Sequence, residues 1–420
     1  MKDTSRPKVL ISAFTCEADE GSEPEVGWRW GHEMAKDVDV IVLTQGKNRE
    51  RIEKWYADHP DHFPKVRFAY FDLNETWSKY KKKWGWALLP YYIFWQWAVT
   101  RKVDQLLGSE GVDIIHHVTF ASFRYPVFLK GRPIVWGPVG GADTAPLSLI
   151  FSGGGILGVG RELFRNIVTF LSANMIGRIN PIGSNGGEVY ASTIGTQRVF
   201  SKAGINSELM PTIGVDITDE VAPQRKPPEK GTLHLLFVGR LHHLKGIHLL
   251  LEVLSQIEDG SVKLSIVGEG DQRKRLTKQV GKLNLEDRVE FIGALPRNKL
   301  DSWYQKADVL VAPSLYESGG LTVLEGFRWA LPAIVLDCGG HAMSVAEGCG
   351  IRVNPHRRKS DVVVGIAAAI RNYLIDPERV VRDGKRGWKR LKTEYSWKAK
   401  REKMIASYKR LAGDCESDES

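Results

Sequence analysis

Apolar, β-branched runs alternate with longer segments of helical spacing, and this rhythm occurs twice along the chain. Such alternation predicts parallel strands covered by helices on both faces. In the first half the expected strands are 8–14, 37–45, 66–72, 112–118 and 133–140. In the second half they are 233–240, 263–270, 288–295, 308–314, 332–337 and 350–355. The pattern therefore predicts an α/β protein with two doubly wound, Rossmann-like domains that bind ligands beyond the carboxyl ends of their strands.

Composition marks the boundary between the halves. Residues 219–231, DEVAPQRKPPEKG, are rich in proline and charge, which predicts a linker between domains at 1–218 and 232–392. Residues 393–413 have helical spacing and a basic face, and we expect this helix to cross back to the first domain. The last residues, 414–420, are typical of a disordered acidic tail.

The charge balance narrows the class of ligand. The 420 residues carry 59 basic and 50 acidic side chains, a net charge of +9, so the surface should attract anions. No recognised nucleic-acid-binding module accompanies this charge, and we expect no nucleic-acid partner. The four cysteines form no C-x-x-C pair, which makes a disulfide framework or a zinc site improbable. No signal-peptide pattern is visible, so a cytoplasmic protein is expected.

Two cations follow the first strand of the second half. Arg240 and Lys245 flank the turn between the strand LHLLFV and a long apolar helix. Cations at a strand end beside a helix N-terminus make a site for anions, because the free N–H groups add to the side-chain charge. The alternative is that both are solvated surface residues.

The stretch YESGGLTVLEGFRW places Glu317 before a glycine pair and Glu325 one turn into the next helix. Gly319 permits a close backbone approach, and Glu325 can accept hydrogen bonds from a ribose diol. The backbone N–H groups expected to hold phosphate oxygens are those of Gly320, Leu321 and Thr322. The alternative is a pair of glutamates on a solvated helix face.

Four segments carry a family resemblance: GRLHHLKG, IVGEGDQRKRL, VEFIGAL and PSLYESGGLTVLEGFRWALPAIVLDCGG. In this order they resemble the donor half of retaining glycosyltransferases of family 4, which have the two-domain GT-B fold. The first half resembles that family more loosely, through GSEPEVGW, DIIHH and GPVGG. The resemblance implies that Arg240 and Lys245 bind the diphosphate of a nucleotide sugar in place of a metal. No metal or other cofactor is then required.

The same resemblance implies roles for further residues. Glu325 would bind the donor ribose, and Glu317 would lie beside the donor sugar. Base recognition is expected from backbone groups near Gly268, Gly270 and Ala294. The only D-x-D sequence, at 37–39, flanks a strand and is interpreted as strand-flanking charge.

Many family members place a histidine at the end of the fourth strand, where it reaches the donor sugar. This chain has His116 and His117 there, which departs from the usual His-x-His arrangement. Strand alternation predicts that the two rings point to opposite faces, and His117 is the preferred candidate for the cleft. Gly27, in GSEPEVGW, is a candidate for shaping the acceptor pocket, although a tight turn alone would explain it.

These residues predict a retaining glycosyltransferase that moves a sugar from a nucleotide-diphosphate donor to an acceptor hydroxyl, in polysaccharide or glycolipid assembly. A nucleotide-sugar 2-epimerase of the same fold is one alternative, and a non-catalytic sugar-nucleotide-binding subunit is another. The sequence GGGILG at 153–158 fits a dinucleotide motif but follows no strand, and it is interpreted as a flexible apolar loop.

One segment suggests a surface for membranes. Residues 77–102 combine Lys79, the lysines at 81–83, Arg101 and Lys102 with clustered tryptophans. Their apolar centre is shorter than the roughly 20 residues that span a bilayer. Cations attract anionic head groups, and tryptophan favours the interfacial layer. We therefore expect peripheral docking on the inner face of the cell membrane, with a glycan or lipid-linked acceptor, although core packing of an N-domain helix is the alternative.

Overall fold

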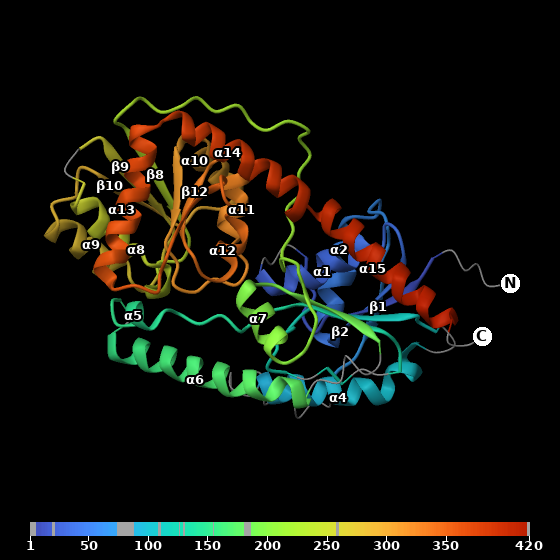
Figure 1. Ribbon diagram of the computed structural model, residues 1–420. Helices are drawn as coiled ribbons and strands as arrows, with labels where there is room; N and C mark the ends of the chain where they lie inside the picture. The colour runs from blue at the N-terminus through green and yellow to red at the C-terminus, as the bar shows by residue number, and fades with distance from the viewer. Residues whose placement is uncertain are drawn as a thin grey trace.

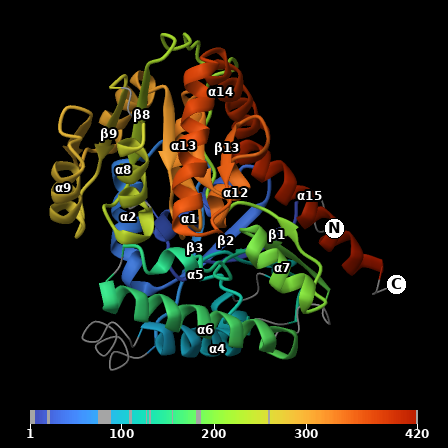
Figure 2. The same ribbon diagram turned by 60° about the vertical axis from the view of Figure 1, so that its left-hand side comes forward.

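The computed structural model describes residues 6–18, 22–73, 88–107, 111–125, 127–128, 131–153, 155–179, 186–257 and 260–417. Two α/β domains lie next to each other, each built on a parallel sheet (Figure 1). Turning the view by 60° shows helices on both faces of the C-terminal sheet (Figure 2). The predicted fold class is confirmed.

In the described part of the chain, the N-terminal sheet has seven parallel strands in the order β3-β2-β1-β4-β5-β6-β7. The strands are β1 Lys8–Ser12, β2 Asp39–Thr44, β3 Arg67–Tyr70, β4 Ile114–His117, β5 Ile134–Val139, β6 Gly187–Ala191 and β7 Glu208–Leu209. The last two were missed from the sequence. Strand β6, GEVYA, has no continuous apolar run, and β7 has two residues.

Alternation along the strands divides this domain into two apolar layers. Val9 and Ile11 of β1 pack with α1 and the C-terminal helix α15, whereas Leu10 packs with α4. The two layers form because successive side chains of a strand point to opposite faces. The helices are α1 Ser22–Met34, η1 Gly46–Asn48, α2 Arg49–Asp58, α4 Leu88–Leu107, α5 Leu147–Ile150, α6 Gly155–Ile179 and α7 Ile194–Lys202.

The C-terminal sheet has six parallel strands among the described residues, in the order β10-β9-β8-β11-β12-β13. Its strands are β8 Leu233–Val238, β9 Val262–Val267, β10 Val289–Gly293, β11 Val309–Ala312, β12 Ala333–Leu336 and β13 Gly350–Val353. Its helical segments are η4 His243–Lys245, α8 Ile247–Ser255, α9 Arg273–Lys282, α10 Arg297–Lys306, α11 Leu321–Arg328, α12 Gly339–Ser344, α13 Lys359–Ile375, α14 Glu378–Arg390, the π-helical η5 Leu391–Tyr395 and α15 Trp397–Ser417. In this order the strand sequence reverses between β8 and β11, which is where such sheets bind ligands.

Each domain sends an element into the other. Helix α15 leaves the C-terminal domain, and Trp397 and Tyr408 are buried in the N-terminal core beside α1 (Figure 1). In return, Leu149 and Ile150 of α5 are buried in the core of the C-terminal domain with α8. Two hydrophobic cores therefore contain residues from both domains.

Several element boundaries differ from the sequence prediction. The stretch around Gly27, expected as a loop, is helical from Ser22, and the predicted loop at 153–158 enters α6 at Gly155. Helix α15 extends to Ser417, so residues 414–417 of the predicted disordered tail are helical. Around Gly27, packing of α1 against the ends of β1 and β4 prevails over a local sequence rich in glycine and polar residues.

Within the membrane-directed segment 77–102, residues 77–87 lie outside the described residues. The remainder belongs to α4, where Tyr91, Tyr92 and Trp95 are buried in the core while Trp97 is exposed. Core packing therefore explains most aromatic residues of the described part. Among the described residues, no helix has the length and apolar character needed to cross a membrane.

Candidate functional site

The carboxyl ends of the two central strands of the C-terminal sheet bring the predicted donor residues together. Lys245 ends η4, which follows β8, and Glu317 follows β11, the neighbouring strand. The Lys245 ammonium donates to the Glu317 carboxylate, with Nζ and Oε2 2.5 Å apart. Residues 72 positions apart in the chain thus meet at the point where the strand order reverses.

A buried histidine lies beside the Lys245–Glu317 ion pair. His341 lies in α12, which follows β12, and its Nε2 is 3.9 Å from Glu317 Oε2. Burial lowers the pKa of His341 to about 4, so its ring is neutral at pH 7. Burial would raise the pKa of Glu317, but attraction to His341 and Lys245 and a hydrogen bond from the Gly319 backbone lower it overall. Glu317 is therefore a carboxylate at neutral pH.

Helix α11 begins directly beyond this carboxylate. Gly320 is its N-cap with φ of +62°, a left-handed conformation that glycine adopts without strain. A Cβ there would lie 3.0 Å from Ser344 Oγ and 3.3 Å from the Gly340 carbonyl oxygen. The N–H groups of Leu321 and Thr322 belong to the first turn, which has no intrahelical acceptor for them. They are suited to an anion, as the sequence predicted.

Arg240 lies in the turn after β8 and is exposed. Gly268 and Gly270 lie on the adjacent loop, and each is packed closely against this turn. A Cβ on Gly268 would be 2.0 Å from the Gly239 carbonyl oxygen, and one on Gly270 would be 2.4 Å from that of Leu241. The structure thus shows these glycines supporting the backbone around Arg240, while Ala294 on the next loop is exposed.

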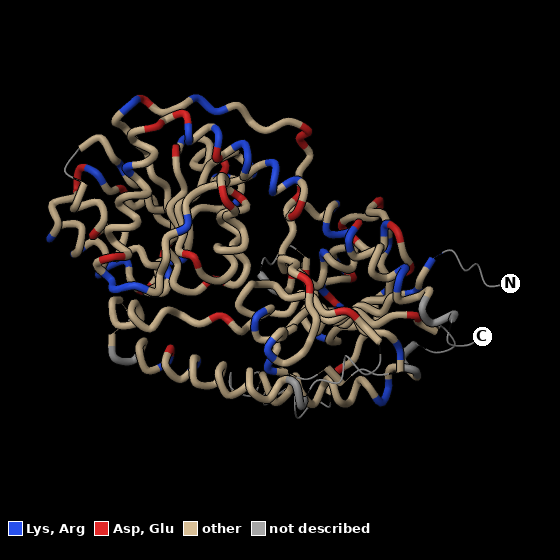
Figure 3. Tube along the Cα trace, in the orientation of Figure 1, with Lys and Arg blue, Asp and Glu red and all other residues tan. Residues whose placement is uncertain are grey.

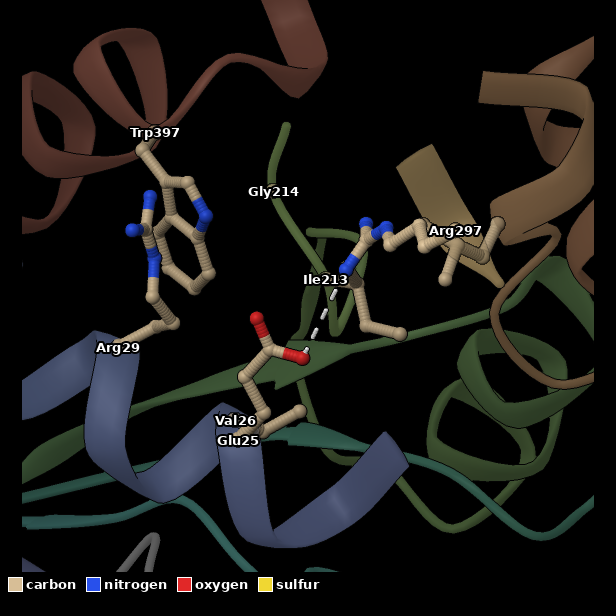
Figure 4. Close-up of a pocket in the computed structure, with 8 residues that line it drawn as sticks. Glu25, Val26, Arg29, Ile213, Gly214, Arg297 and Trp397 are labelled. Atoms are coloured by element: carbon tan, nitrogen blue, oxygen red, sulfur yellow. Dashed lines mark ion pairs between the residues drawn. The ribbon is translucent and has the colours of Figure 1, made fainter. Parts of the chain in front are cut away.

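Glu325, predicted to bind ribose, is one turn inside α11. It accepts a 2.9 Å hydrogen bond from the Tyr304 hydroxyl and lies 3.4 Å from the Arg297 guanidinium. Burial raises the pKa of Glu325, although these two partners oppose the rise. The same guanidinium is 3.9 Å from Glu25 on α1, so one arginine links the two domains (Figure 4).

A small interdomain cavity surrounds this link. Its volume is about 30 Å³, and it lies between α1, the start of α11 and the beginning of α15 (Figure 4). Its lining includes Glu25, Arg29, Arg297, Leu321 and Trp397. The predicted phosphate-binding helix end therefore faces the other domain across a narrow space.

The two strand-end histidines are both buried. His116 bonds through Nδ1 to the Tyr408 hydroxyl at 2.6 Å and through Nε2 to the Gly137 carbonyl oxygen at 2.7 Å. His117 bonds to Ser12 Oγ at 3.1 Å and to the Tyr92 hydroxyl at 2.9 Å. Burial lowers the pKa of His116 to about 3 and that of His117 to about 4.

The rings point to opposite faces of the sheet, as alternation predicted: His116 packs near Trp30, and His117 packs near Tyr92. Neither ring is exposed to solvent. A contact between either ring and a donor sugar remains a prediction.

Gly27 has a packing role in the structure. It lies inside α1, and a Cβ there would be 2.3 Å from the Thr15 carbonyl oxygen and 3.1 Å from a Thr119 methyl group. Glycine is therefore required for α1 to lie close to the ends of β1 and β4. A role of Gly27 in shaping an acceptor pocket remains a prediction.

Three residues near the site were missed from the sequence. His341 follows β12 directly after the glycines 339 and 340, a strand-end signal of the kind that identified Glu317. Arg297 begins α10 on a surface-like sequence. Arg165 of α6 stacks on Tyr316, the residue before Glu317. Its guanidinium carbon is 3.8 Å from the centroid of the Tyr316 ring. For Arg297 and Arg165 the sequence contains no local signal, because tertiary contacts alone bring them to the site.

The sequence of the C-terminal half matches a known family. Residues 219–387 match the family model of glycosyl transferases group 1. Glycogen synthase of Mycobacterium tuberculosis is 32% identical over 173 residues, which cover 40% of this chain and 41% of that protein. D-inositol 3-phosphate glycosyltransferase of Pseudarthrobacter chlorophenolicus is 33% identical over 135 residues, which cover 30% of this chain and 32% of that protein. The chain thus spans about two fifths or less of the length of these relatives.

Solved structures resemble the whole chain. Sucrose-phosphate synthase of Thermosynechococcus elongatus has a TM-score of 0.60 at 20% identity and covers 97% of this chain and 100% of its own. HepE of Anabaena in complex with UDP has a TM-score of 0.58 at 18% identity and covers 98% of this chain and 100% of its own. These likenesses show the GT-B fold. Together with the group 1 match, they support a glycosyltransferase.

His, Cys, Asp and Glu side chains are the ones that could hold a metal ion. Among the residues that the structure describes, no group of three or more His, Cys, Asp or Glu side chains has an arrangement that could hold a metal ion. Asp37 instead lies 2.8 Å from Arg401 of α15, so the D-x-D sequence contributes to interdomain packing.

The Lys245–Glu317 contact leads to a stability prediction. Replacing Lys245 with methionine leaves Glu317 buried without its cation, so its pKa should rise. We expect the free energy of unfolding at pH 7 to fall by about 1–3 kcal/mol. A carboxyl group with a lowered pKa stabilises the fold above its unfolded pKa and loses this effect as pH falls through the folded pKa. The difference in free energy of unfolding between the wild type and Lys245→Met should therefore shrink below about pH 4. Urea denaturation at a series of pH values measures this difference.

The control is Lys359→Met. Lys359 lies 2.5 Å from Glu252, the same distance, but both side chains are more exposed. Its loss should cost less than about 1 kcal/mol. Equal losses in the two variants would contradict a special role of burial at the Lys245–Glu317 pair.

Proposed function

We propose that this chain is a retaining, metal-independent glycosyltransferase of family 4. It would transfer a sugar from a nucleotide-diphosphate donor to an acceptor hydroxyl in polysaccharide or glycolipid assembly. The observation that supports this most is the grouping of Lys245, Glu317 and the start of α11 at the ends of β8 and β11. These residues lie within the segment that matches glycosyl transferases group 1. The proposed location is cytoplasmic, on the inner face of the membrane.

In this proposal the departing diphosphate is bound by charge and by backbone N–H groups. Lys245 has three donors, so it can bond Glu317 and a phosphate oxygen at once. Arg240 would approach from the opposite side of the turn, and Leu321 and Thr322 would donate from α11. Such preorganised donors stabilise the negative charge that develops on the leaving group.

Glu317 would act beside the donor sugar. A carboxylate that is ionised at neutral pH can stabilise the positive charge of an oxocarbenium-like ring. For retention of configuration, we propose that the leaving phosphate accepts the acceptor proton on the same face, so that no covalent nucleophile is needed. For a histidine contact to the sugar we propose His117, the candidate that the sequence favours. Both ring nitrogens of His117 are hydrogen-bonded, as those of His116 are, so a donor sugar would have to displace Ser12 or Tyr92.

The solved neighbours indicate which donors to test. One solved neighbour, HepE of Anabaena, is in complex with UDP-glucose. Thermal-shift measurements with UDP-, GDP- and ADP-sugars test donor binding, because a ligand of the folded state raises the melting temperature. Acceptor-dependent release of nucleoside diphosphate distinguishes transfer from 2-epimerisation and from binding without turnover. No shift with any nucleotide sugar would contradict the proposed function.

Arg240→Ala and Lys245→Ala should each lower kcat by about two to three orders of magnitude, the usual cost of losing one group that stabilises transition-state charge. The measurement is steady-state release of nucleoside diphosphate. Lys274→Ala, which removes an exposed cation on α9, is the matched control and should stay within about twofold. Activity near wild type in both Arg240→Ala and Lys245→Ala would contradict the diphosphate assignment.

Glu325→Ala should act on donor affinity. A ribose contact is made equally in the ground and transition states, so its loss raises KM and changes kcat little. The expected rise in KM is about tenfold, corresponding to one or two hydrogen bonds to a charged group. Tyr304→Phe is the control, since it removes the hydroxyl that bonds Glu325 and retains the carboxylate. A fall in kcat with unchanged KM in Glu325→Ala would contradict the ribose role.

Chelation tests metal independence. Because cationic side chains and helix N–H groups would supply the charge that other transferases obtain from a divalent ion, EDTA should leave the rate unchanged. The comparison is the initial rate with and without chelator, followed by added Mn²⁺ or Mg²⁺. Loss of activity that these ions restore would show that the mechanism requires a metal.

A further inference from the structure

Helix α6 exposes a stripe of large apolar side chains. Phe164, Ile167, Leu171 and Met175 recur at helical spacing, and Phe170 lies beside them. Their exposed fractions lie between 53% and 69%. From Phe164 to Met175 the stripe is about 16 Å long. Scattered exposed apolar residues are ordinary, but a continuous row on one helix face marks an interaction surface.

The neighbouring elements extend this surface. In both ribbon views α6 lies beside α4 along one edge of the molecule (Figures 1 and 2). Trp97 of α4 is 45% exposed, with the Arg101 guanidinium carbon 3.8 Å from its ring centroid. Phe151, which follows α5, is 68% exposed. Exposed apolar side chains therefore also occur on the elements that neighbour α6.

The charges around the stripe favour an anionic partner. Among the α6 side chains that the structure describes, Arg161 and Arg165 accompany a single acidic residue, Glu162. Glu162 is 3% exposed and pairs with Arg165 on the inner side of the helix. Figure 3 shows most of the described run of α6 in tan, as uncharged residues. A helix with an apolar outer face and flanking cations is typical of segments that lie in the interface of a bilayer.

We propose that the outer face of α6, with Trp97 and Phe151, docks onto an anionic lipid bilayer. The apolar stripe enters the boundary between head groups and acyl chains, while Arg161 and Arg101 bind lipid phosphates. This surface shares Trp97 and Arg101 with the segment 77–102, but its apolar stripe belongs to α6, another helix.

The position of α6 gives this surface a consequence for the acceptor, which rests on the proposed function. Arg165 on the inner side of α6 stacks on Tyr316, next to Glu317. One helix diameter, about 10 Å, therefore separates the membrane face from the segment that carries the donor carboxylate. The fitting acceptor is a lipid-linked glycan or glycolipid whose reactive hydroxyl lies close to the head groups.

Flotation with lipid vesicles tests the surface without any substrate. The full chain should bind vesicles of phosphatidylcholine with phosphatidylglycerol, bind pure phosphatidylcholine more weakly, and lose binding as salt is raised. The variant Phe164→Gln, Ile167→Gln, Leu171→Gln, Met175→Gln should partition into the anionic vesicles at least about tenfold less. Glutamine is chosen because it favours helix and so leaves α6 intact.

The matched control carries the same number of substitutions at exposed apolar positions on other elements. These are Phe63→Gln, Val221→Gln, Val364→Gln and Ile375→Gln. This control should float like the wild type. Equal flotation of the α6 variant and the wild type, or equal loss in the control, would overturn the proposal. So would a wild-type dimer in lipid-free buffer that the α6 variant abolishes, because the stripe would then bind a second copy.

A nucleotide-sugar thermal shift separates this proposal from the proposed function. The α6 variant should keep the melting temperature and the donor shift of the wild type, since its substitutions lie on the outer side of the helix. Loss of the variant's own fold would appear as a lowered melting temperature without donor. In that case Leu171→Gln alone, compared with Val364→Gln, must still lower flotation, or the proposal fails. Flotation without any donor shift would leave the membrane surface standing and refute the transferase.

Discussion

The chain crosses between the domains twice, near Val215 and near Ser396. These two segments pair with each other, and the geometry of the site depends on this pairing. The Val215 N–H donates to the Tyr395 carbonyl at 2.9 Å, and the Trp397 N–H donates to the Val215 carbonyl at 3.2 Å. The Trp397 ring then packs edge-on against Trp30 of α1. Gly214 allows this, since a Cβ there would lie 2.6 Å from the same ring. The crossing is thus fixed by backbone and aromatic contacts together.

From this crossing, two reciprocal contacts hold the domains face to face. Helix α15 contributes to the N-terminal core, and α5 contributes to the C-terminal core. Arg297 can therefore lie between Glu25 of one domain and Glu325 of the other. The start of α11 therefore lies across a narrow space from α1, and residues of both helices line that space.

The sequence predicted the parts of this protein that depend on local chemistry. Each of the eleven segments predicted as strands overlaps a strand of one of the two sheets, because β-branched runs bounded by turns have few other stable arrangements in a parallel sheet. Lys245, Glu317 and Gly320 could be placed for the same reason: the first two lie in the segments that follow β8 and β11, and Gly320 caps α11. The membrane role of the aromatic segment 77–102 was the weaker inference, since burial of Tyr91, Tyr92 and Trp95 within α4 follows from packing and leaves no local signature.

By itself, then, the sequence determined the two doubly wound α/β units, since strand periodicity and strand-end turns are local properties of the chain; the donor roles of the strand-end residues stay predictions. Only the tertiary structure decided which residues cross between domains and which apolar residues stay outside. The apolar spacing of α6 is the same whether its stripe faces a core or solvent, and Arg165 and Arg297 carry no mark of their partners. Those outcomes depend on packing between segments far apart in the chain, which no local pattern specifies.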